Sequence, residues 1–145
     1  MKFSLERTIN KSRVEVWEFF TDAEKTRLWQ PSLQSIEIVE GMAGQPGAIS
    51  KWTYKENERE FSLTEKVLKR EVPERFESQF ENEFAIDIVN NVFIEQSDHE
   101  TLWMMETTYR FKTLLMKILG SALKKNYVLR SEKEMERFKE IVEQQ

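Results

Sequence analysis

Apolar and polar residues alternate over residues 2–10, with Phe3, Leu5, Arg7 and Ile9 at positions of one parity. In a β-strand, side chains two residues apart point to the same face of the sheet. The alternation therefore predicts a strand with one buried face. Arg7 shares that face although its side chain is charged.

Ser12 and Glu15 form an S-x-x-E pattern directly before a run of apolar residues. In such a capping box the serine hydroxyl and the glutamate side chain satisfy free backbone N–H groups at the start of a helix. The pattern predicts a short helix over residues 13–20.

Thr21 and Glu24 repeat the capping pattern immediately afterwards. We expect a second short helix to begin there and to end near Trp29, because Pro31 disfavours helical geometry in the residue before it.

Residues 33–111 show the alternation of strands, interrupted by turn signals. A glycine-rich stretch, Gly41–Gly47, predicts a loop between two of the strands, and Pro73 ends another. One strand stops and the next begins somewhere in residues 82–86, with Ile86 and Ile88 expected on the same parity as Phe80. About seven strands are predicted in all. Their apolar markers are Ile36, Ile38, Trp52, Tyr54, Phe61, Leu63, Val67, Phe76, Phe80, Phe84, Ile86, Ile88, Val92, Ile94, Trp103, Met105, Tyr109 and Phe111.

The stretch from Leu114 to Val142 contains no proline and is rich in Leu, Lys and Glu, which predicts one helix about 45 Å long. One apolar stripe runs its length, and the small residues Gly120 and Ser131 on the same side leave room beneath it. The stripe consists of Met116, Leu123, Tyr127, Met135, Phe138 and Val142.

The first half of this helix is apolar on its other side as well. Either loops and the early helices cover this second face, or it is a dimer contact or a mobile lid at a pocket mouth. The residues concerned are Leu114, Leu115, Ile118, Leu119, Ala122 and Leu129.

Length and composition indicate one α+β domain over residues 1–145 with enough apolar material for a core. The formal net charge is −4, which argues against binding to nucleic acid. The chain has no cysteine, so disulfides, thiolate metal sites and cysteine nucleophiles are excluded. Residues 1–7 lack the apolar run of a signal peptide, and no stretch is long enough for a membrane span, so we expect a cytoplasmic protein.

Two local patterns suggest chemistry but have simpler explanations. Gly41, Gly44 and Gly47 resemble a phosphate-binding loop, yet strands are predicted on both sides, where a nucleotide loop would lead into a helix. They are interpreted as turn residues. His99, the only histidine, lies in a polar turn and has no partner for a metal site or a nucleophile pair. No catalytic residue, metal site or cofactor is predicted.

Some polar residues occupy strand positions whose parity is otherwise apolar, and a buried polar group is costly unless it is hydrogen-bonded. They pair with one another, lie near strand ends or belong to strands whose predicted parity is wrong by one residue, or else they orient a ligand in an apolar pocket. In the last case Glu65 or Arg7 could also act in acid–base chemistry. These residues are Arg7, Glu65, Asn82, Asn90 and Thr107.

The order of elements, one strand, two short helices, about six strands and a long final helix, resembles the helix-grip fold of the START and Bet v 1-like superfamily. Residues 12–25 and Leu28-Trp29-Gln30-Pro31 resemble the first-helix pattern of its small polyketide cyclase-like members. The Gly41–Gly47 loop and the strand at residues 101–111 strengthen the similarity, which covers nearly the whole chain.

The resemblance implies a cavity between a curved antiparallel sheet and the final helix, which relatives use to hold sterols, lipids, hormones or polyketides. We expect a hydrophobic small molecule to bind there, with aromatic residues offering apolar area and a polar tip. Two alternatives stay open: a polyketide cyclase or dehydratase, and a protein-interaction or stress-related module that uses the apolar final helix and could form a homodimer. The expected ligand-binding residues are Arg7, Trp52, Tyr54, Glu65, Asn90, Trp103, Met105, Thr107, Tyr109, Leu123 and Tyr127.

Overall fold

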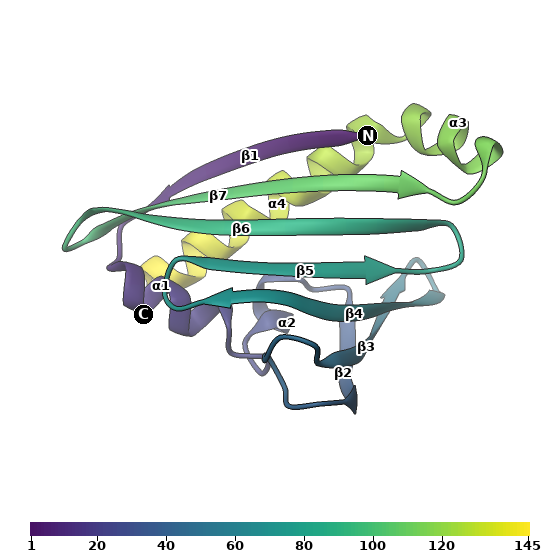
Figure 1. Ribbon diagram of the computed structural model, residues 1–145. Helices are drawn as coiled ribbons and strands as arrows, with labels where there is room; N and C mark the ends of the chain where they lie inside the picture. Colours follow the sequence, from purple (N-terminus) through teal and green to yellow (C-terminus); the bar gives the residue numbers. More distant parts are fainter.

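Seven antiparallel strands form one curved sheet, and a C-terminal helix crosses its concave face (Figure 1). The computed structural model describes all residues from Met1 to Gln145. The strand order across the sheet is β1-β7-β6-β5-β4-β3-β2. The elements are β1 Lys2–Ile9, α1 Arg13–Phe20, α2 Thr26–Trp29, β2 Leu33–Glu40, β3 Ile49–Glu56, β4 Arg59–Glu71, β5 Arg75–Glu81, β6 Ala85–Ser97, β7 Glu100–Phe111, α3 Leu114–Ala122 and α4 Lys124–Glu143.

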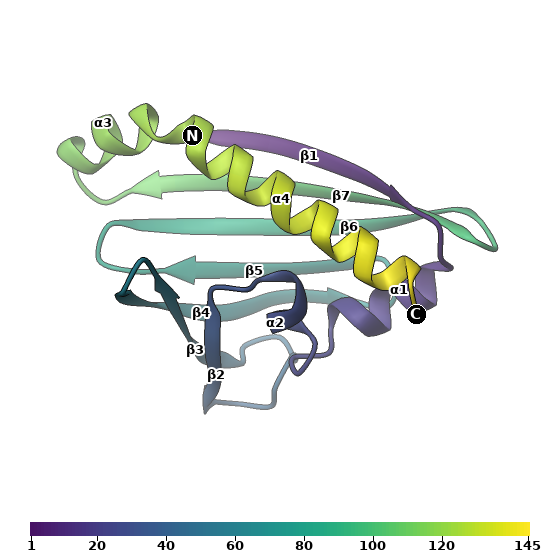
Figure 2. The same ribbon diagram turned by 180° about the vertical axis from the view of Figure 1, so that it is seen from behind.

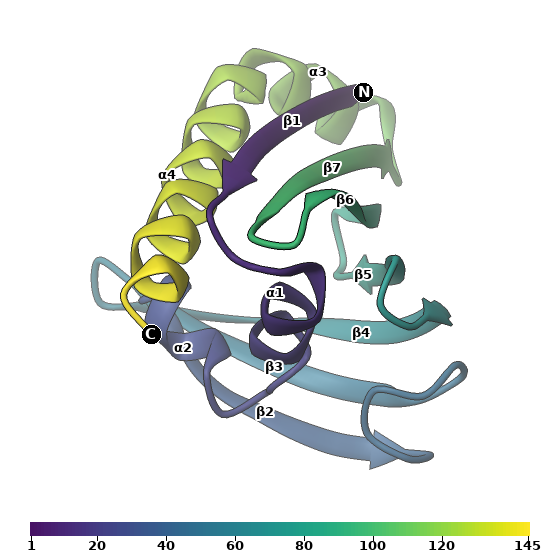
Figure 3. The same ribbon diagram turned by 90° about the vertical axis from the view of Figure 1, so that its left-hand side faces the viewer.

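The sheet bends around α4 because several of its strand pairs contain irregularities in register. Shifts occur between β2 and β3, between β4 and β5 near Val67, and between β6 and β7 near Glu95. Such bulges increase local twist and bend the strand. Figure 2 shows α4 lying diagonally over the concave face, and Figure 3 shows α1 and α2 beneath its C-terminal end. This is the expected helix-grip architecture.

The solid core of the protein occupies only one end of this arrangement. Phe138 and Val142 of α4 pack there against α1, α2 and the sheet. Aromatic rings meet edge to face, as between Trp29 and Phe138, whose centroids are 5.3 Å apart. The other half of α4 has no such packing beneath it. The core consists of Ile9, Val16, Trp17, Phe19, Trp29, Phe93, Trp103, Met135, Phe138 and Val142.

The first capping box forms as predicted, but the second does not. The Ser12 hydroxyl accepts a hydrogen bond from the Glu15 N–H, and the Glu15 carboxylate accepts one from the Ser12 N–H. Thr21 instead ends α1, and its hydroxyl donates to the Trp17 carbonyl. Because Thr21 serves α1 in this way, α2 begins only at Thr26 and still ends at Trp29.

The predicted single C-terminal helix is two helices, which is a correction to the sequence analysis. At Leu123 the backbone leaves helical geometry, with φ −96° and ψ 2°, and α4 starts in a new direction. The break lets Gly120 lie against the Phe111 ring while Tyr127 stacks on Tyr109, with ring centroids 5.3 Å apart. The space expected beneath Gly120 is thus filled by Phe111.

The predicted parity of β6 was also wrong. The Asn82 N–H donates to the Ala85 carbonyl across a two-residue turn, so Asn82 and Ala85 face the same side. Inward positions therefore change from even numbers in β5 to odd numbers in β6. Ile86, Ile88 and Asn90 point to the outer face, because neighbouring side chains alternate. Because the outer face of β6 is itself apolar, the alternation alone does not show which parity of β6 faces inward.

The glycine loop is confirmed as a turn. Gly41, Gly44 and Gly47 all have positive φ, at 78°, 76° and 88°. That conformation favours glycine, which lacks a Cβ. His99 lies exposed in the turn between β6 and β7, as expected. None of the helices combines the length and the apolar composition needed to cross a membrane.

Candidate functional site

A cavity of about 570 Å³ lies between the concave face of the sheet and the N-terminal half of α4. The volume falls in the range of small-molecule sites, which span roughly 300–1,000 Å³. Tyr127, Ser131 and Glu134 of α4 face this space, and Met135 closes it against the core. The side of α4 that faces the sheet therefore carries polar groups above the cavity and apolar residues above the solid core.

Two rows of side chains cross the sheet along the floor of the cavity. The first runs through Ser50, Glu65, Phe80, Asp87 and Tyr109, which are successive partners on β3 to β7. Neighbouring strands lie about 4.8 Å apart, so the backbones of Glu65 and Asp87 are about 10 Å apart, with Phe80 between them. Two acidic groups thus flank one aromatic ring.

The second row follows one step further along the strands. It consists of Val67, Ser78, Val89 and Thr107. Its hydroxyl groups support the acidic residues of the first row, because Ser78 and Thr107 lie beside Glu65 and Asp87. Val89, between them, presents an apolar surface at the centre of the floor.

Glu65 is buried and fully engaged in hydrogen bonds. Its two carboxylate oxygens accept from the Ser50 hydroxyl at 3.2 Å and from the Ser78 hydroxyl at 2.8 Å. The Trp52 indole N–H donates to Ser50 Oγ at 3.0 Å, which completes a short network. Burial raises the pKa of the Glu65 carboxyl, and the hydrogen bonds offset this only in part.

Asp87 forms a second acidic centre with β7. The Thr107 hydroxyl donates to its carboxylate. Burial raises the pKa of Asp87 to about 6, although Thr107 and Tyr109 favour its ionised form. Burial, together with the nearby charge of Asp87, also raises the pKa of the Tyr109 hydroxyl, so this phenol stays protonated.

Glu134 brings a third carboxyl from the helix above. Burial raises its pKa to about 7, with Arg130 acting in the opposite direction and Glu56 adding to the increase. Arg130 itself is paired with Glu56 at 3.0 Å. Arg70, the other arginine that lines the cavity, lies over the Trp17 ring at 5.4 Å. No lysine or histidine lines the cavity.

Most residues expected to bind ligand do line this cavity. The aromatic members carry polar tips with partners, as between the Tyr54 hydroxyl and the Gln30 side chain at 3.0 Å. Trp103 donates its indole N–H to Asn91 at 2.9 Å. The expected residues that line the cavity are Trp52, Tyr54, Glu65, Trp103, Met105, Thr107, Tyr109 and Tyr127.

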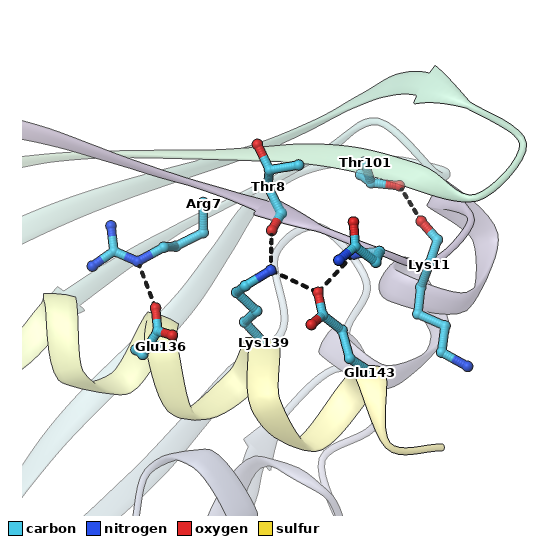
Figure 4. Close-up of polar contacts among 8 residues, drawn as sticks. Arg7, Thr8, Lys11, Thr101, Glu136, Lys139 and Glu143 are labelled. Atoms are coloured by element: carbon cyan, nitrogen blue, oxygen red, sulfur yellow. Dashed lines mark hydrogen bonds and ion pairs between the residues drawn. The ribbon is translucent and has the colours of Figure 1, made fainter.

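Arg7, Asn90 and Leu123 do not line the cavity. Arg7 has the expected inward parity but lies near the sheet edge, where its Nε donates to Glu136 of α4 at 3.1 Å (Figure 4). Asn90 belongs to the outer face, and Asn91 takes the inward position instead. Leu123 is exposed at the break between α3 and α4.

The contacts in Figure 4 serve to fix α4 across the sheet. Lys139 donates to the Thr8 carbonyl at 2.6 Å and pairs with Glu143 at 2.7 Å. Glu143 also accepts from the Asn10 N–H at 2.8 Å. Through its contact with Glu136, Arg7 belongs to this set of contacts, which hold α4 over the cavity.

Asp87 and Glu134 were not among the site residues predicted from the sequence. Asp87 was hidden by the parity error in β6. Glu134 lies seven residues after Tyr127 and four before Phe138, so helical spacing along the apolar stripe could have identified it. No cluster of three or more His, Cys, Asp or Glu residues has the arrangement needed to hold a metal ion.

Comparison with solved structures gives the same fold at low sequence identity. The structure of Ara h 8.0201 matches with a TM-score of 0.80 and 18% identity, covering 100% of this chain and 99% of that chain. TTHA0849 from Thermus thermophilus matches with a TM-score of 0.72 and 18% identity, covering 99% and 95%. NE0264 from Nitrosomonas europaea gives 0.78 and 12%, again covering 99% and 95%.

No curated protein matches the sequence. A family model, described as polyketide cyclase / dehydrase and lipid transport, matches residues 1–143. Together with the Bet v 1-like helix-grip fold, this match over almost the entire chain shows that the protein belongs to the polyketide cyclase/dehydrase and lipid transport family.

Proposed function

We propose that this protein binds a hydrophobic small molecule, lipid-like or polyketide-like, in the cavity between the sheet and α4. The observation that carries the proposal is the division of α4: its C-terminal half packs on a solid core, while its N-terminal half covers about 570 Å³ of space. Aromatic and aliphatic side chains make up most of the cavity wall. A few fixed polar groups are available to orient a ligand, as in known small-molecule sites.

The polar groups of the cavity favour a ligand that donates hydrogen bonds. The carboxyls of Glu56, Glu65, Asp87 and Glu134 line the cavity, and ionised carboxylates only accept. Of the two arginines that line it, Arg130 is paired with Glu56, whereas Arg70 lies over the Trp17 ring and has no ion pair. A ligand carboxylate placed beside Asp87 and Glu134 would be repelled, whereas a hydroxyl or an amine would donate to them.

The proposal is tested with N-phenyl-1-naphthylamine, an apolar fluorescent probe that carries one N–H donor. We expect saturable binding at one site per chain. Val89→Trp places a large ring at the centre of the cavity floor and should abolish binding. Ile88→Trp, the adjacent residue on the outer face, is the matched control and should leave the probe affinity unchanged.

Equal probe binding by the two variants would place the ligand elsewhere, and absence of binding to the unaltered chain would remove the proposal. Circular dichroism of both variants establishes that each is folded before binding is compared.

A second candidate function, that of a cyclase or dehydratase, is supported by the acidic groups themselves. Burial brings the pKa of Asp87 to about 6 and that of Glu134 to about 7. Groups that titrate near neutrality suit general acid–base catalysis. Asp87 lies on the sheet and Glu134 on the helix, so a bound substrate would have one on each side. Loss of turnover of a polyketide-type substrate in both Asp87→Asn and Glu134→Gln would favour this function over simple binding.

A further inference from the structure

The helix α3 presents four large apolar side chains to solvent. Leu114 is 74% exposed, Leu115 and Ile118 are each 60% exposed, and Leu119 is 48% exposed. With 100° of rotation per residue, these four positions share one side of α3, opposite Gly120. Gly120 is the point at which α3 touches the body, on the Phe111 ring. The apolar face therefore points away from the protein.

The charge around this face is opposite to that of the rest of the chain. Residues 107–131 contain six basic residues and no acidic one. The remainder holds 16 of the 22 basic residues and all 26 acidic ones. Lys112 and Arg130 are paired with Glu81 and Glu56. The unpaired positive charge of this segment therefore comes from Arg110, Lys117, Lys124 and Lys125, in a protein whose formal net charge is −4.

A second pocket, of about 480 Å³, lies directly beneath α3 and has a cationic wall. Arg110, Lys117 and Lys124 line it, together with Tyr109 and Phe111. Tyr109 and Phe111 also line the main cavity, so the two spaces share a wall. β7 leads directly into α3 at one end of the sheet (Figure 1). The apolar face, the cationic wall of the second pocket and the Phe111 end of the main cavity therefore lie close to one another.

We propose that α3 and the cationic segment around it form a docking surface for an anionic phospholipid bilayer. The leucine and isoleucine side chains enter the acyl boundary while the lysines and Arg110 contact lipid phosphates, as in interfacial amphipathic helices. Docking brings the Phe111 end of the cavity to the membrane, where a hydrophobic ligand can enter or leave.

The charge pattern selects this occupant over two others. A symmetric dimer through α3 would bring two copies of the cationic segment together, and like charges at an interface oppose association. A nucleic acid would neutralise the cations but would leave the apolar side chains in water. An anionic bilayer satisfies both features. This inference does not depend on the proposed ligand, because docking alone can be measured.

The test is co-sedimentation of the full chain with vesicles of phosphatidylcholine, or of an equimolar mixture of phosphatidylcholine and phosphatidylglycerol. We expect binding to the anionic vesicles, weakened by added salt, and little binding to the neutral ones. Leu115→Asp/Ile118→Asp should weaken binding at least about tenfold. Val39→Asp/Met42→Asp, at apolar side chains exposed elsewhere, is the matched control and should bind like the unaltered chain.

A second pair of variants tests the charge contribution without touching the apolar face. Lys117→Gln/Lys124→Gln should weaken binding about 25-fold, since each lysine near an anionic surface contributes about fivefold. Lys51→Gln/Lys66→Gln makes the same change in net charge on exposed strand positions and should have little effect. Equal effects of the two pairs would overturn the proposal.

Two other results would also overturn it. The first is absence of binding to anionic vesicles. The second is a dimer in solution that Leu115→Asp/Ile118→Asp dissociates, because the apolar face would then be covered by a second copy of the chain.

Discussion

In the proposed ligand site, individual carboxyl groups would determine which ligands the cavity accepts. Aromatic residues line the cavity, but they are also common in the solid core at the other end of the molecule. Glu65, Asp87 and Glu134 distinguish the two regions. Glu65 is already engaged with Ser50 and Ser78, so Asp87 and Glu134 have more capacity to accept from a ligand.

The first prediction concerns how much the buried Asp87 carboxylate lowers the stability of the folded protein. Its pKa rises from 3.8 to about 6 on folding. As pH increases through this interval the unfolded chain loses its proton first, so stability present at low pH is lost between about pH 4 and pH 6. Asp87→Asn removes the cost, while its amide oxygen can still accept from Thr107. At pH 8 the variant should be more stable by about 3 kcal/mol.

Urea unfolding of the Asp87→Asn variant and the unaltered chain at several pH values measures this difference. Glu134 titrates in both proteins and cancels in the comparison. Asp98→Asn, at an exposed position in the turn between β6 and β7, should show no such trend. A stability difference that stays constant from pH 4 to pH 8 would contradict the assigned environment of Asp87.

The second prediction concerns ligand selectivity. Among dodecylamine, dodecanol and dodecanoate, which share one chain length, affinity at pH 8 should decrease in that order. The amine can donate to Asp87 and Glu134, whereas the carboxylate meets like charge. Asp87→Asn should weaken amine binding at least about tenfold and leave the alcohol nearly unchanged, because a hydrogen bond to a charged group is worth about 1.5–3 kcal/mol. Competition against N-phenyl-1-naphthylamine provides the measurement, and tighter binding of the carboxylate would refute the order.

At the scale of elements, the alternation of strands and the capping signals predicted most of the fold. The strands between β1 and β7 appear where apolar alternation and turn residues indicated them, and the capping box at Ser12 fixes the start of α1. The errors arose where one local signal served another element. Thr21 ends α1 instead of starting α2, and the turn before Ala85 changes the parity of β6.

The break at Leu123 could not be predicted from the sequence, because residues 114–142 contain no proline and their one glycine, Gly120, disfavours a helix by only about 1 kcal/mol. It follows from long-range contacts of Gly120 with Phe111 and of Tyr127 with Tyr109. Such contacts depend on where β7 ends relative to the sheet. Because long-range contacts also decide which side chains reach the cavity, the sequence indicated the kinds of residue that line the cavity better than their exact positions.

The third prediction tests the contact that holds α3. A Cβ at Gly120 would lie 2.0 Å from the Phe111 ring, so the helix or the ring must move. Alanine normally stabilises a helix by about 1 kcal/mol relative to glycine. Here overpacking should outweigh this gain, and Gly120→Ala should lower stability by about 1–2 kcal/mol.

Ser121→Ala, at the exposed neighbouring position, is the control and should be neutral or slightly stabilising. In a Phe111→Ala background, Gly120→Ala should no longer destabilise. Thermal unfolding of the unaltered chain, Gly120→Ala, Phe111→Ala and the double variant gives the coupling between the two sites. If Gly120→Ala raises the melting temperature of the otherwise unaltered chain, the contact is not as described.

At the scale of the whole molecule, the chain divides into a packed end and a hollow end. Aromatic packing of α1, α2 and the C-terminal half of α4 stabilises the first. The second lies beneath the N-terminal half of α4, and α3 adjoins it through Phe111. Since the buried apolar cluster lies at the packed end, cavity residues can carry polar groups that a solid core would exclude.

The fourth prediction tests the ligand site most directly, by native mass spectrometry of the protein purified from its own host, with Val89→Trp and Ile88→Trp purified in parallel. We expect a non-covalent adduct of one small molecule per chain in the unaltered protein and in Ile88→Trp. The adduct should be released on denaturation and be absent from Val89→Trp. Ligand-free masses in all three proteins, or the same adduct in all three, would contradict a ligand site in this cavity.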